Sequence, residues 1–197
     1  MSSLTAENPA SATVQAAPDY CCCDTLVLGC GNELFGDDGF GPAVARRLGR
    51  SAELPRSAVA LDVGTSVRQV LFNIVLSPLR PRRIVVVDAV DDKKGRRSGE
   101  VWTMKARDLP EVKCDDFSMH QLPTSNLLRE LDELGGVEVT CVVAQITPLP
   151  GEVRPGLSEP LQRAVPRAAE MILGLCRPGA RPLGPAGAAP LEEHSND

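Results

Sequence analysis

The chain is poor in aromatic residues, in histidine and in long apolar runs. Its 197 residues include one Trp, one Tyr, four Phe and two His, so the core is expected to be mainly aliphatic. No segment approaches the roughly 20 consecutive apolar residues that span a bilayer. The first ~20 residues lack the basic start and apolar stretch of a secretory signal. The sequence therefore predicts a globular protein of the cytoplasm.

An excess of basic charge and a paired cysteine pattern are also absent. Lys and Arg total 21 against 26 Asp and Glu, and the resulting net charge of -5 argues against nucleic acid or an anionic membrane as a partner. The odd number of cysteines favours reduced thiols, and none has zinc-type spacing. Because adjacent side chains diverge in an extended segment, the triplet at 21–23 is interpreted as a partly buried strand entry rather than a metal site. The cysteines are Cys21, Cys22, Cys23, Cys30, Cys114, Cys141 and Cys176.

Two compositionally biased tails flank a single domain. Residues 1–22 are rich in Ala, Ser, Pro and Thr, and residues 177–197 are rich in Pro, Gly and Ala. Neither tail can bury enough apolar surface to offset the entropy lost on ordering, so both are predicted to be disordered. The remaining segment, 23–176, is long enough for one complete core.

Within this domain, apolar runs typical of strands alternate with amphipathic stretches typical of helices. This alternation predicts an α/β fold with a mostly parallel sheet and helices on both faces. The unbroken apolar run at 84–88 indicates a strand buried on both sides. Strands are expected over 25–29, 59–63, 84–88 and 138–146, with a side strand at 100–105. Helices are expected over 41–49, 66–76, 124–134 and 158–175.

A glycine-rich acidic loop follows the first expected strand. Residues 29–41 contain five glycines together with Glu33, Asp37 and Asp38. Glycine permits tight turns and close backbone approach, so such a loop can fold around a group that the carboxylates hold. Acids suit a cation or a proton-transfer site better than a phosphate. The glycine spacing also differs from that of a dinucleotide-binding fingerprint.

Three acids and one histidine are placed to form a site at one edge of the sheet. Asp38, Asp62 and Asp88 lie at or beyond strand ends, where open parallel sheets bind ligands. If the first and third strands are neighbours, Asp38 and Asp88 face the same crevice. His120 precedes the helix expected at 124, and the helix dipole there disfavours the imidazolium. Two carboxylates and one imidazole suit Ni, Zn, Mn or Fe.

Structural roles explain some of the same residues. An acid at a strand end often caps the next helix or tethers a turn, which is the favoured interpretation of Asp37 and, from the pattern alone, of Asp62. Taken singly, Asp88 and His120 fit a structural role as well as a functional one. A thiol nucleophile at Cys30 or Cys114 would need a histidine partner. Because His120 is already assigned as a metal ligand, a thiol protease is the less favoured interpretation.

Four segments, in this order, resemble the nickel-iron hydrogenase maturation endopeptidases, and the resemblance covers roughly residues 24–175. The sequence of the first segment is most similar to that of the family branch that serves deazaflavin-coenzyme-reducing and related cytosolic hydrogenases. The segments are the loop at 29–41, Asp62-Val-Gly-Thr65, Val85-Val-Val-Asp-Ala89 and Ser118-Met-His-Gln-Leu122.

This resemblance implies a three-layer α/β/α sandwich with a mostly parallel twisted sheet. It implies an aspartate-type endopeptidase that removes the C-terminal peptide of a hydrogenase large-subunit precursor once nickel is inserted. The implied catalytic and nickel-reading residues are Asp38, Asp88 and His120, with Asp37 and Asp62 as secondary residues. The first of these is commonly Glu in other branches of the family. Nickel would be borne by the substrate and bound transiently, and no organic cofactor is expected.

Two other classes of function stay open at this point. A non-catalytic nickel-docking module would keep the three ligands and release no peptide. A nucleotide-binding α/β protein would keep its activity after replacement of Asp38 or His120. A monomer is expected, because nothing in the sequence marks a large apolar patch.

Overall fold

The fold is built on one five-stranded sheet with strand order β2-β1-β3-β5-β4. The computed structural model describes residues 17–92, 95–108, 125–133, 135–146 and 152–177. β1, β2, β3 and β5 are parallel, and β4 pairs with β5 in the antiparallel direction. The side strand expected at 100–105 is therefore confirmed as an edge strand. The strands are β1 (Thr25–Cys30), β2 (Ala58–Gly64), β3 (Arg83–Val90), β4 (Val101–Lys105) and β5 (Glu138–Gln145).

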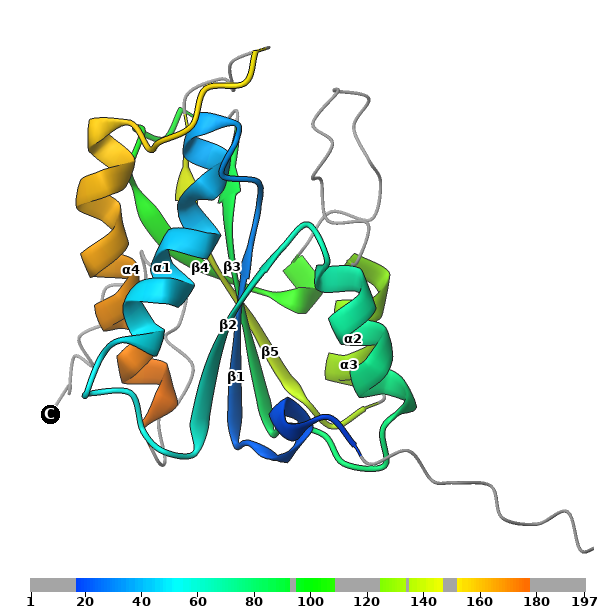
Figure 1. Cartoon of the computed structure of the whole chain (residues 1–197). Helices are drawn as coiled ribbons and strands as arrows, with labels where there is room; N and C mark the ends of the chain where they lie inside the picture. Colours follow the sequence, from blue (N-terminus) through cyan, green and yellow to red (C-terminus); the bar gives the residue numbers. More distant parts are fainter. Residues whose placement is uncertain (1–16, 93–94, 109–124, 134, 147–151, 178–197) are drawn as a thin grey trace, which may run out of the picture.

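Helices cover both faces of this sheet, as the alternating pattern predicts. α1 and α4 lie on one face, and α2 and α3 lie on the other (Figure 1). The expected three-layer α/β/α sandwich with a mostly parallel sheet is confirmed. The α-helices are α1 (Phe40–Gly49), α2 (Val67–Leu76), α3 (Ser125–Glu133) and α4 (Glu159–Cys176). The 3-10 turns are η1 (Asp19–Cys22), η2 (Gly36–Gly39) and η3 (Ala106–Asp108).

The central strands are the most deeply buried part of the structure. All six residues of β1 are buried, and so are residues 84–88 of β3. The edge strand β2 is only half-buried along most of its length. The continuous apolar runs in the sequence thus correspond to strands covered on both faces, as expected for a parallel sheet between two helical layers.

Strand order reverses between β1 and β3. From β1 the chain passes through α1 to β2 on one side, and then returns through α2 to β3 on the other side of β1. Ligands bind at such a switch point, beyond the carboxyl ends of the strands. The predicted adjacency of the first and third strands is confirmed, and it places the loop after β1 beside the end of β3.

A short turn precedes β1 and packs against the domain. Asp19–Cys22 form the 3-10 turn η1, in which Cys21 is only 1% exposed and packs against the apolar core. Cys22 is exposed, and the Cys23 thiol donates a hydrogen bond to the Tyr20 carbonyl oxygen. The cysteine triplet is therefore the end of a turn rather than a strand entry, and its three residues differ in exposure.

None of the described helices is both long and apolar enough to cross a membrane.

Two glycines allow α1 to approach the carboxyl ends of β1 and β3 closely. A Cβ atom at Gly41 would overlap the carbonyl oxygens of Cys30 and Val87. A Cβ atom at Gly29 would overlap the carbonyl oxygen of Gly41. Because backbone lies on both sides of this contact, neither position can accept a side chain without moving the helix away from the sheet.

We expect Gly41→Ala to lower the free energy of unfolding by about 1–3 kcal/mol, the usual cost of overpacking a core. Gly174→Ala is the matched control, because Gly174 is exposed in α4 and a Cβ there meets no atom within 4 Å. The control is expected to gain about 0.5–1 kcal/mol from helix propensity. Urea denaturation of both variants measures the difference. Equal stability of Gly41→Ala and the wild type would contradict the close contact.

Candidate active site

The loop after β1 folds back over the end of the strand and buries two adjacent carboxylates. Asp37 and Asp38 lie in η2 and are 6% and 2% exposed. The backbone N–H of Asn32 donates a hydrogen bond of 2.6 Å to Asp38 Oδ2. The turn needs glycine at position 31, where φ is +124° and a Cβ atom would overlap the Asp38 carbonyl oxygen. The loop therefore holds the Asp38 carboxylate in a defined position.

Both carboxylate oxygens of Asp37 accept hydrogen bonds from the residue that precedes α4. Ser158, the residue before α4, donates its backbone N–H to Oδ1 at 2.7 Å and its hydroxyl to Oδ2 at 2.9 Å. A carboxylate at this position satisfies a free N–H group at the helix start and interacts favourably with the helix dipole. These contacts fit the cap or turn interpretation of Asp37, and they differ from the contact of the neighbouring Asp38.

Asp88 lies at the carboxyl end of β3 and is 5% exposed. Side chains alternate along a strand, so Asp88 shares a face with Ile84 and Val86, which pack in the core beneath α2 and α3. Burial raises the pKa of Asp88 from the ordinary 3.8 to about 7. A hydrogen bond from the Ala89 N–H opposes this rise in pKa, and the negative charge of Asp38 adds to it. Asp38 and Asp88 therefore interact electrostatically, as their places in the sheet predict.

Buried thiols close to this pair are held in the protonated state. Cys30 ends β1, and burial raises its pKa well above the ordinary value, with further increases from the charges of Asp88 and Asp38. Burial likewise raises the pKa of Cys141 to about 12. Because the thiolate is the reactive form of cysteine, this environment disfavours Cys30 as a nucleophile. Cys114, the other thiol considered, lies outside the described residues.

Asp62 is placed at a rim of the site rather than with the buried pair. It lies on β2 opposite Gly29, and its side chain is 34% exposed. Arg46 Nη1 donates to Asp62 Oδ2 at 2.9 Å, and the same guanidinium pairs with Glu33. The hydrogen bond from Arg46 lowers the pKa of Glu33. Arg46 thus joins the loop after β1 to β2.

A pocket of about 340 Å³ lies between this loop and the end of β2. Glu33 and Asp62 contribute acidic groups to its lining. The pocket is lined by Gly31, Asn32, Glu33, Leu34, Pro42, Asp62, Gly64 and Thr65.

The histidine predicted as the third ligand, His120, lies outside the described residues. Within the described part of the chain, no three His, Cys, Asp or Glu side chains converge on a position that could hold a metal ion. Of the predicted set, Asp38 and Asp88 are both buried and lie near enough to interact electrostatically. The sequence pattern did not predict the partners of the acids around the site: Arg46, which pairs with Glu33 and Asp62, and Ser158, which donates to Asp37. Ser158 carried a usable signal, because Ser followed by Glu and Pro is typical of a helix start.

A buried carboxyl pair of this kind offers two kinds of chemistry. Carboxylate oxygens at a strand end are ligands for a divalent cation. A carboxyl group with a pKa near 7 can also accept or donate a proton at neutral pH.

Comparison with known proteins places the chain in a family. The hydrogenase maturation protease (HycI) family model matches residues 42–175. A candidate hydrogenase maturation protease of Methanocaldococcus jannaschii is 36% identical over 153 residues, which cover 77% of this chain and 95% of that protein. Coenzyme F420 hydrogenase subunit delta of Methanothermobacter thermautotrophicus is 34% identical over 155 residues, covering 76% of this chain and 92% of that protein.

A solved structure supports the same assignment. The crystal structure of the NiFe hydrogenase maturation protease HycI from Thermococcus kodakarensis has a TM-score of 0.58 to this chain. It is 26% identical, and the match covers 77% of this chain and 91% of that one. The predicted resemblance is confirmed: the chain belongs to the hydrogenase maturation protease family and is an endopeptidase that processes the large subunit of a hydrogenase.

Proposed function

We propose that this endopeptidase recognises nickel carried by its substrate, and that it removes the C-terminal peptide of a nickel-iron hydrogenase large subunit after nickel insertion. The observation that supports this most is the buried pair Asp38 and Asp88 at the switch point of the sheet. In the proposal these two carboxylates and His120 bind the substrate's nickel. The remaining coordination positions stay with ligands from the substrate itself.

The electrostatics of Asp38 and Asp88 support the proposed binding of a cation. Asp88 is buried beside the negative charge of Asp38, and this raises its pKa to about 7. A divalent cation would reverse the repulsion, and Asp88 would lose its proton on binding. In the proposal, binding of the substrate's cation is therefore coupled to the loss of this proton.

The chain connectivity supports His120 as the third ligand. Residues 109–124 join η3 to α3, and α3 covers the same face of the sheet on which Asp88 lies. Imidazole nitrogen is a common ligand for nickel and completes a set of two oxygens and one nitrogen.

For the cleavage step, we propose aspartate-type chemistry in which nickel positions the peptide bond beside the carboxyl pair. One carboxylate takes a proton from the attacking water, the water oxygen forms the new bond to the carbonyl carbon, and the C–N bond breaks as the amine gains a proton. A direct attack by a carboxylate is the second route that the same geometry allows. A thiolate route is disfavoured, because the described thiols nearest to the pair are buried and protonated.

The relatives support a choice among substrates and cellular compartments. Similarity to a coenzyme F420 hydrogenase subunit supports a substrate from the deazaflavin-coenzyme-reducing or related hydrogenases.

All described cysteines are free thiols, which supports action in the reducing cytoplasm. We propose that the enzyme acts there as a monomer. The nucleotide-binding alternative finds no support in the family match.

The residue assignment predicts which variants lose activity. Asp38→Asn, Asp88→Asn and His120→Gln are each expected to reduce cleavage of a nickel-loaded large-subunit precursor by at least about 100-fold. Asp19→Asn is the matched control, because Asp19 is exposed in η1, which precedes β1 at the amino ends of the strands, away from the candidate site. Intact-mass spectrometry of the precursor gives the rate. Normal cleavage by the three variants would refute the assignment. Binding without cleavage by the wild type would instead favour the docking-module alternative.

The raised pKa of Asp88 predicts how stability depends on pH. Between the unfolded value of 3.8 and the folded value of about 7, the folded state binds more protons than the unfolded state. The contribution of Asp88 to stability is therefore complete in acid and is lost as the pH rises toward 7.

Asp88→Asn removes this dependence. Relative to the wild type, the variant is expected to be more stable at about pH 8 than at about pH 5, by about 1–3 kcal/mol. Urea denaturation of both proteins at the two pH values measures the difference. A variant effect that is the same at both pH values would show that Asp88 has an ordinary pKa.

A further inference from the structure

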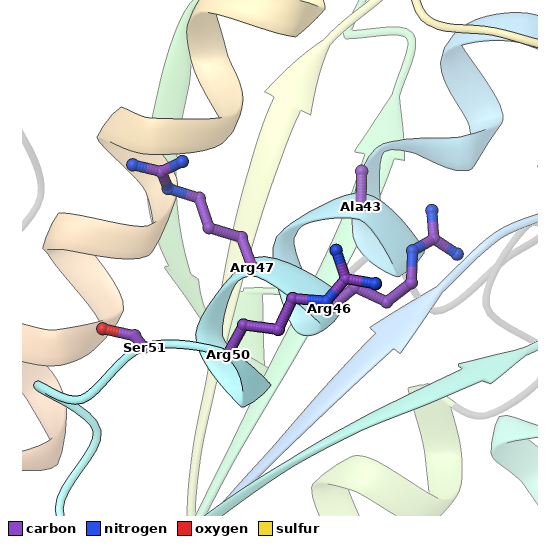
Figure 2. A pocket seen from close by; sticks show the side chains of 5 residues that line it. All are labelled: Ala43, Arg46, Arg47, Arg50 and Ser51. Carbon is purple, nitrogen blue, oxygen red and sulfur yellow. The ribbon is translucent and has the colours of Figure 1, made fainter.

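Three arginines, two on α1 and one directly after it, line a second hollow outside the candidate active site. Arg46, Arg47 and Arg50 surround a surface depression of about 490 Å³ together with Ala43 and Ser51. Figure 2 shows Arg46 and Arg50 extending to one side of α1 and Arg47 extending toward the side on which α4 lies. We call the surface formed by these three side chains the arginine face.

The arginine face carries positive charge that the described residues neutralise only in part. Arg46 pairs with Glu33 and Asp62, but Arg47 and Arg50 are exposed and have no ion-pair partner among the described residues. No acidic side chain lines the hollow. The chain as a whole has a net charge of -5, so the face is opposite in sign to the protein. Such a local excess attracts an acidic partner segment.

The position of the face ties it to the reaction site. α1 begins two residues after Asp38, and a helix rises ~1.5 Å per residue, so Arg50 lies about 15 Å along the helix from its start. An extended peptide covers this distance in about four or five residues. Arg46 also contacts Glu33 and Asp62, which line the 340 Å³ pocket at the end of β2. The pocket and the arginine face thus form adjoining parts of one surface.

We propose that the arginine face binds an acidic segment of the hydrogenase large-subunit precursor, located within about five residues of the bond that is cut. The inference rests on the proposed active site for its distance from the cut bond. Guanidinium groups bind carboxylates through paired hydrogen bonds, so the face supplies both attraction and register to the incoming chain. Arg46 holds the wall between pocket and face, and Arg47 and Arg50 supply the free charges.

The test uses the full chain and the nickel-loaded precursor. Arg47→Glu/Arg50→Glu is expected to raise both the KM for cleavage and the Kd for the precursor by about tenfold, with a smaller change in kcat. For the neutral variant Arg47→Gln/Arg50→Gln, we expect a KM and a Kd between those of the wild type and those of the double Glu variant. Arg80→Glu/Arg82→Glu is the control, because it makes the same charge change at two exposed residues of the loop that joins α2 to β3.

Two further measurements separate binding by charge from a general loss of structure. Raising the salt from about 50 to about 300 mM should weaken precursor binding to the wild type more than to the double Glu variant. Changing the precursor's acidic residues near the cut to Lys should restore binding to the double Glu variant. Restored binding of the Lys-substituted precursor to the double Glu variant supports the proposal. The proposal is overturned if the double Glu variant binds the unchanged precursor with the Kd of the wild type and the Lys substitutions do not strengthen its binding.

The same experiment keeps the two proposals distinguishable. If the wild type cuts the precursor and the arginine variants bind and cut it equally well, the arginine face has no such role and the proposed function stands. If the wild type binds without cutting and the arginine variants lose binding, the arginine face is supported and the proposed catalytic function fails.

Discussion

The close approach of α1 to the carboxyl ends of β1 and β3 is the constraint on which the rest of the site depends. Gly29 and Gly41 remove the side chains that would keep the helix away, and backbone atoms then meet backbone atoms. Because the helix lies so near the sheet, the turn that precedes it is forced over the switch point. This turn is η2, and it carries Asp38 into the environment of Asp88. A family member with a bulkier residue at either glycine would need a different path for the loop.

The proximity of two buried carboxylates works against stability, and neighbouring contacts compensate for it. Asp38 receives the N–H of Asn32, and Asp88 receives the N–H of Ala89. Asp37 fixes the same turn to the start of α4 through Ser158, so the loop is anchored to a segment far away in the sequence. Burial raises the pKa of Asp88, and the negative charge of Asp38 adds to this rise. In the proposed function, a cation brought by the substrate relieves this repulsion, which couples recognition of the metal to correct placement of the peptide.

Most of the fold could be predicted from the sequence because its signals are local. The continuous apolar run at 84–88 and the alternation of helix and strand patterns led to the correct layers, and the acids beyond strand ends led to Asp38 and Asp88. What could not be predicted depends on contacts between distant segments. The bond between Asp37 and Ser158 joins residues 121 positions apart, and the bridge from Arg46 to Glu33 and Asp62 exists only once the sheet has formed. η1 was missed because a single turn with one buried cysteine has no periodic pattern. His120 lies outside the described residues and stays a prediction.

The central claim is that Asp38 and Asp88 bind the nickel of the substrate. X-ray absorption at the nickel edge tests it most directly, comparing the nickel-loaded precursor alone with the same precursor bound to the protease. The account predicts that nickel gains oxygen and nitrogen ligands in the complex, and that the oxygen contribution falls when Asp38→Asn/Asp88→Asn replaces the wild type. An unchanged nickel environment in a complex that still cleaves the precursor would contradict the account.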